Sequence, residues 1–123
     1  MVEPIDPRVD VGHVHLKVAD LDRALDFYCG VLGFELQQRL GDEAAFVSAG
    51  GYHHHVGLNT WAGPGAPSPP PGARGLVRFQ VVLPEEGAVD EAAQRLGRVA
   101  SVDRVDGGVS ATDPSGNTVL VGV

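Results

Sequence analysis

The chain has 123 residues, 43% of them hydrophobic, and a formal net charge of −7. This length predicts one soluble globular domain. An acidic surface without a Lys/Arg cluster repels phosphate backbones, and no apolar run approaches the ~18 residues of a membrane span, so we expect neither a nucleic-acid partner nor a membrane. A single cysteine, Cys29, excludes an internal disulfide, and residues 1–10 lack the pattern of a signal peptide. Both features indicate a cytoplasmic protein.

Residues 12–18 predict a short strand with two chemically different faces. Its apolar residues alternate with His13, His15 and a lysine, and successive side chains of a strand point to opposite faces. One face therefore joins a core, while the other carries two imidazoles. The segment 75–83 repeats this design and places Arg78 where the first copy has His13. The chain is consistent with an internal repeat of one structural module.

The other elements follow from periodicity and turn residues. After an arm over 1–10 and the strand over 12–18, we expect a helix that begins after Asp20 and ends at Gly33, and then strands over 34–40, 44–49 and 52–61. The segment 62–74 holds five prolines and three glycines, which favours an extended linker. Beyond it we expect a strand over 75–83, a helix with Val89, Ala92, Ala93 and Leu96 on one stripe, and strands over 98–105, 109–112 and 118–123. The predicted class is α+β, one domain over 11–123 with two βαβββ modules, 11–61 and 75–123.

Five short stretches occur in an order that is typical of one family. They are Gly-His-Val-His-Leu-Lys-Val-Ala-Asp-Leu, Ala-Leu-Asp-Phe-Tyr, Val-Leu-Gly-Phe-Glu, Gly-Gly-Tyr-His-His-His-Val-Gly-Leu-Asn-Thr-Trp and Asp-Pro-Ser-Gly-Asn. Together they resemble the vicinal oxygen chelate superfamily, which contains glyoxalases, bleomycin-resistance proteins and extradiol dioxygenases. The triple-histidine stretch is most similar to the N-terminal half of catechol-2,3-dioxygenase-type proteins. The resemblance implies two modules whose curled mixed sheets enclose a concave cavity.

The resemblance also implies three positions for the ligands of a divalent metal. They fall on His13, Arg78 and Leu120 in this sequence. A guanidinium stays protonated and offers only donors, and an aliphatic side chain removes the anionic oxygen that Fe, Mn or Mg prefers. We therefore expect no cofactor at the usual site. The alternative is Fe, Mn, Zn or Ni held by an unconventional histidine set that includes His13 and His55.

Nine residues are candidates for binding a ligand in the cavity: His13, His15, His53, His55, Asn59, Trp61, Arg78, Gln80 and Leu120. Imidazole, amide and guanidinium groups could supply directional hydrogen bonds, and the indole could stack on an aromatic ring. Ordinary packing, solvent exposure or hydrogen bonding to water is the competing interpretation for each. We expect His54 to face the helix side of its strand or to lie at the strand end.

Three functions remain open. The first is a metal-free protein that binds a small apolar or aromatic molecule. The second is a metal-dependent enzyme of the extradiol-dioxygenase or lyase type with a non-standard histidine ligand set, or a cofactor-independent enzyme with a histidine base. The third is a vestigial structural domain. Single-chain dioxygenases that resemble this sequence carry more modules per chain, so the resemblance favours a homodimer that completes the sheets.

Overall fold

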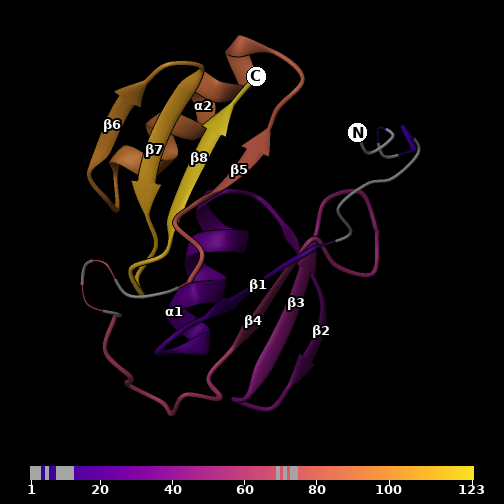
Figure 1. The fold of residues 1–123 in the computed structure, drawn as a ribbon, viewed down its shortest axis with the longest axis vertical. Coiled ribbons are helices and arrows are strands. Elements are labelled where there is room, and N and C mark those ends of the chain that lie inside the picture. Colours follow the sequence, from indigo (N-terminus) through magenta and orange to yellow (C-terminus); the bar gives the residue numbers. More distant parts are fainter. Residues whose placement is uncertain (1–3, 5, 8–12, 69, 71, 73–74) are drawn as a thin grey trace.

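The fold consists of two four-stranded mixed sheets, each accompanied by a helical segment (Figure 1). The computed structural model describes residues 4, 6–7, 13–68, 70, 72 and 75–123, so most of the predicted arm over 1–10 and part of the linker over 62–74 lie outside the described residues. The first module contains β1 (Val14–Lys17), α1 (Leu21–Leu25), η1 (Asp26–Val31), β2 (Glu35–Leu40), β3 (Ala44–Ser48) and β4 (Val56–Asn59). The second contains β5 (Phe79–Val82), α2 (Glu86–Gly97), β6 (Val102–Val105), β7 (Gly108–Thr112) and β8 (Thr118–Gly122). The α+β class and the two βαβββ modules are confirmed.

The two sheets have the same internal order. In the first, β1 lies parallel to β4, and the sheet continues through antiparallel β3 and β2. In the second, β5 lies parallel to β8, and β7 and β6 follow. The sheets are not hydrogen-bonded to each other, so each of β1 and β5 keeps one edge free of strand pairing within the described chain. These two edges lie where the modules meet (Figure 1).

The first helical segment begins and ends as the sequence predicts. The Asp20 carboxylate accepts a hydrogen bond of 3.0 Å from the backbone N–H of Arg23, which satisfies one of the unpaired donors of the first turn. After one turn the helix widens into the π-helical segment η1. Gly33 follows with a φ of 93°, a conformation that only glycine adopts without strain.

One apolar core joins the two modules. It includes inward-facing residues of both sheets and of all the helical segments: Leu16, Val18, Leu21, Ala24, Phe27, Tyr28, Ala45, Val47, Val56, Leu58, Ala92, Leu96, Val109, Ala111, Val119 and Val121. Three of the four stripe residues predicted for the second helix are buried, and Ala93 packs against them. Because this core spans the chain from β1 to β8, the modules are held in a fixed relation rather than linked only by the proline-rich segment.

A buried polar contact reinforces that relation. Tyr28 of η1, which is fully buried, donates a hydrogen bond of 2.6 Å to the carboxylate of Asp113 in the turn before β8. Burial, followed by the charge of Asp113 and by this hydrogen bond, raises the pKa of Tyr28 above its ordinary value. The same turn holds the end of β1, since the Asn117 amide donates to the Lys17 carbonyl at 2.9 Å. A turn of the second module thus fixes two elements of the first.

Three predicted strands are longer than the structure shows. The strand predicted over 75–83 covers only Phe79–Val82, and turns shorten the other two. The strand predicted over 52–61 begins only at Val56, because Gly50 and Gly51 form a turn with φ of 70° and 81° and pairing with β3 starts after it. The strand predicted over 98–105 begins at Val102, because the chain after α2 still bonds back to the helix, as in the contact from Ala100 N–H to the Leu96 carbonyl. In the strands predicted over 52–61 and 98–105, a turn occupies residues that alternation alone assigned to a strand.

Among the described residues, no helix combines the length and apolarity needed to cross a membrane.

Candidate functional site

A cavity lies between the free edges of β1 and β5. It has a volume of about 410 Å³ and is lined by His13, Val14, Phe34, Ala49, His55, Val56, Phe79, Gln80, Val81 and Val82. We call it the intermodule cleft. Its size falls within the ~300–1,000 Å³ that is usual for small-molecule sites. Three of the nine predicted ligand-binding residues, His13, His55 and Gln80, line it.

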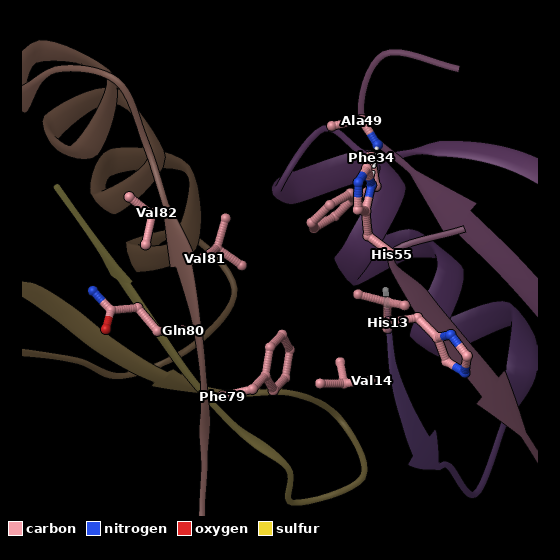
Figure 2. A pocket seen from close by; sticks show the side chains of 10 residues that line it. His13, Val14, Phe34, Ala49, His55, Phe79, Gln80, Val81 and Val82 are labelled. Carbon is pink, nitrogen blue, oxygen red and sulfur yellow. Dashed lines mark hydrogen bonds between the residues drawn. The ribbon is translucent and has the colours of Figure 1, made fainter. Parts of the chain in front are cut away.

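The interior of the cleft is apolar. Figure 2 shows that Phe79 and Val81 project from β5 toward the first module, with the Phe79 ring directed at Val14. Because side chains alternate along a strand, Gln80 points to the opposite side, and its amide is directed away from the cleft in the same view. A guest between β1 and β5 would therefore meet hydrocarbon and an aromatic ring, not the amide that the sequence suggested.

His55 is the polar group of the cleft whose orientation is fixed. Its Nδ1 accepts a hydrogen bond of 3.1 Å from the backbone N–H of Ala49 (Figure 2). In a neutral imidazole the nitrogen that accepts is unprotonated, so the proton is on Nε2. His55 can therefore offer one N–H donor to a hydroxyl, carbonyl or acidic oxygen of a guest.

The other histidines gather on the face of the first sheet that is turned away from α1. The His13 ring lies 4.3 Å from His54, and His54 lies 4.9 Å from Phe46. The Nδ1 atoms of His53 and His54 are 3.0 Å apart. Desolvation, followed by repulsion from the other four histidines, lowers the pKa of His54 below its ordinary value. His54 lies two residues before β4, at the strand end that was one of its two expected positions, because the chain at 53–55 is not a strand and does not alternate.

A separate aromatic pair lies further along the same face. His15 stands opposite Gly57 in the β1–β4 register, and a Cβ at that glycine would come within 2.7 Å of the imidazole. The ring therefore lies flat over the glycine and stacks on Trp61, with ring centroids 5.3 Å apart. Trp61 remains 68% exposed. Burial, followed by the charge of His13, lowers the pKa of His15.

The remaining predicted residues are not brought to the cleft. Asn59 is buried, and both ends of its amide bond the backbone: it donates to the Leu16 carbonyl at 3.5 Å and accepts from the Trp61 N–H at 3.1 Å. Arg78 is exposed just before β5. Leu120 is half-buried between Gln80 and Ser110 in the second sheet.

The residues present do not fit the metal site of the resemblance. Within the described parts of the chain, no group of three or more His, Cys, Asp or Glu side chains is placed to hold a metal ion. His13 directly precedes β1 in the first module, while Arg78 and Leu120, which offer no ligand atom, belong to the second module. A cationic guanidinium and an aliphatic side chain cannot replace an imidazole and a carboxylate as ligands.

Comparison with known proteins identifies the family of this chain. A model of the Glyoxalase/Bleomycin resistance protein/Dioxygenase superfamily matches residues 10–121. The chain belongs to this superfamily. The catechol-2,3-dioxygenase of Bacillus subtilis (strain 168) is 45% identical over 106 residues, which make up 85% of this chain but 37% of that enzyme. The chain therefore spans little more than a third of the length of this relative.

Solved structures agree with this assignment. Lactoylglutathione lyase from Agrobacterium tumefaciens has 29% identity and a TM-score of 0.69, with 95% of both chains covered. An antibiotic binding protein from Streptomyces sp. CB03234 has 22% identity and a TM-score of 0.63, over 96% of this chain and 98% of its own. Proteins with this fold thus carry names that indicate either a reaction or binding.

Sequence reasoning missed most of the apolar wall of the cleft. Phe34, Ala49 and Val81 line it, but in the sequence they look like core residues of ordinary strands. The only available signal was the internal repeat, which makes β1 and β5 equivalent strands of their two modules. That signal does not reveal how far apart the two edges lie.

Proposed function

We propose that this protein binds a small apolar or aromatic molecule in the intermodule cleft, without a divalent metal at the position usual for its relatives. The observation that carries the proposal is the apolar interior formed by Phe79, Val81 and Val14, with a single oriented donor from His55. Apolar walls with few fixed polar groups are the common composition of small-molecule sites. The antibiotic binding protein of the same fold is consistent with a binding role.

A homodimer is part of this proposal. The faces of both sheets that are turned away from the helices expose large hydrophobic side chains, including Leu40 and Trp61 on the first and Val82 and Val105 on the second. Apolar surface of this kind is usually covered by a partner. Light scattering at micromolar concentration tests the homodimer. We expect the mass of a dimer, and the mass of a monomer would refute the proposed dimer.

A metal-dependent dioxygenase is the second candidate. The 45% identity to a catechol-2,3-dioxygenase and the presence of His13 beside His53 and His54 favour it. This candidate requires a ligand set that differs from that of the superfamily. Oxygen uptake in the presence of catechol and Fe(II), lost on His13→Ala, would support it over the binding role.

The binding role is tested with phenylnaphthylamine, a neutral aromatic dye whose fluorescence rises in apolar sites. Ala49 is exposed and lines the cleft, so Ala49→Phe should fill the cleft without disturbing the core and should weaken binding at least about tenfold, equivalent to ~1.4 kcal/mol. Ala62→Phe, at another exposed alanine away from the cleft, is the matched control and should bind as the wild type does. No binding by the wild type, or equal binding by both variants, would leave the vestigial-domain alternative.

A further inference from the structure

The intermodule cleft does not end at Val82. A second hollow of about 310 Å³ shares Phe34, Ala49, Val81 and Val82 with the cleft and continues it toward α2. Because four residues line both hollows, the two adjoin each other along β5, and we call them together the channel. The far hollow is also mainly apolar, and its only charged lining residues among those described are Glu91 and Arg95.

The combined channel is long enough for two fused or linked rings. The near hollow begins at Phe79, and the far hollow reaches Leu83. Four residue steps of a strand, at about 3.3 Å each, give a length of about 13 Å. A single benzene ring would leave much of this length empty, whereas an elongated aromatic molecule would cover the apolar wall from end to end.

Arg95 is positioned to receive an acidic group at the far end. It is half-buried in the last turn of α2, and its Nε donates a hydrogen bond of 2.7 Å to the Val31 carbonyl. This bond anchors the guanidinium while its terminal nitrogens make no hydrogen bond or ion pair with any other described residue. A planar guanidinium with free N–H groups binds carboxylate or sulfonate oxygens through paired hydrogen bonds.

We propose that the channel binds an elongated aromatic anion. Its rings pack against Phe79 and Val81 of β5, and its acidic group binds Arg95. The proposal rests on the proposed function and adds the charge and the orientation of the ligand. Glu91 lies one helical turn before Arg95 and lines the same hollow, so its carboxylate opposes the anion and limits affinity. The anionic contact is thus assigned to Arg95, not to the exposed Arg78, which is the arginine among the nine candidate ligand-binding residues of the sequence analysis.

Two dyes that differ only by an acidic group test the inference. Phenylnaphthylamine is neutral, and anilinonaphthalene sulfonate has the same rings with one sulfonate. We expect Arg95→Gln to weaken sulfonate binding about tenfold or more, the usual effect of losing a charged hydrogen bond, and to leave the neutral dye within about twofold. Arg98→Gln, an exposed arginine one turn later that does not line the channel, is the matched control and should change neither dye.

Glu91→Gln supplies a result of the opposite sign. It should strengthen binding of the sulfonate severalfold and leave the neutral dye unchanged, and it retains the Arg95 anchor should Arg95→Gln fold poorly. One result overturns the inference and leaves the proposed function standing. In that result the neutral dye binds and is weakened by Ala49→Phe, while neither Arg95→Gln nor Glu91→Gln alters the ratio of the two dye affinities. If neither dye senses Ala49→Phe, the proposed function itself has failed.

Discussion

Replacing Tyr28 by phenylalanine should measurably loosen the junction that shapes the intermodule cleft. The phenolic O–H donates to Asp113 at 2.6 Å, and the two residues are 0% and 4% exposed, so water cannot replace the lost donor without opening the core. A hydrogen bond to a buried charged group is worth about 1.5–3 kcal/mol. Asp113 keeps its other donors, from the Ser115 and Asn117 N–H groups and the Asn117 amide. We therefore expect a loss of about 2 kcal/mol in the free energy of unfolding, not a failure to fold.

Urea and thermal unfolding of the two proteins provide the assay. With an unfolding entropy of about 2.1 cal/mol/K per residue, a loss of about 2 kcal/mol lowers the Tm by about 8 °C for a chain of this length. Tyr52→Phe is the matched control, because Tyr52 is 39% exposed and its hydroxyl has no hydrogen bond with another described residue. A change below about 0.5 kcal/mol for Tyr28→Phe, equal to that of the control, would refute the role given to this contact.

Three further results are expected from the same structure. Protonation of His15 beneath Trp61 should change the emission of the single tryptophan with a midpoint below pH 6.5, and His15→Gln should abolish this titration; a pH-independent emission would contradict the stacking. Because the pKa of His54 is lowered in the fold, the unfolded chain binds more protons below pH 6.5, so the Tm should fall on acidification and His54→Gln should flatten that fall. Gly108→Ala should cost about 2–3 kcal/mol in urea unfolding, since its Cβ would overlap the Val121 carbonyl; a neutral effect would show that β7 and β8 can separate there.

The fold was largely predictable because the signals that define it are local. Alternation over 12–18 and 75–83, the Asp20 cap and the glycine at 33 each act within a few residues. The structure has a strand within each of the two segments, although β5 begins only at Phe79, and a helical segment between Asp20 and Gly33. The errors fall where a turn interrupts alternation, as at Gly50 and Gly51. No periodicity count reveals that residues 52–55 leave the strand, because a positive φ at glycine is a property of the backbone that the side-chain pattern does not record.

The site was less predictable, because it depends on the distance between two sheet edges. The strand pattern placed His13 and His15 on one face, yet only His13 reaches the cleft, and Figure 2 shows its ring directed away from Phe79. Arg78 and Leu120 were predicted as site residues because they replace expected metal ligands. Arg95 was not predicted, because no motif surrounds it in the sequence. A helix residue becomes part of a site only through the packing of that helix against the first module, and sequence spacing does not encode that packing.

Mapping amide chemical shifts during a titration with phenylnaphthylamine tests the central claim most directly. If the apolar cleft between the modules binds aromatic guests, the largest changes should fall on Val14, His55, Phe79 and Val81, from both modules at once. Changes confined to Trp61 and its surroundings, or spread evenly over exposed hydrophobic residues, would contradict a binding site at the junction of the two sheets.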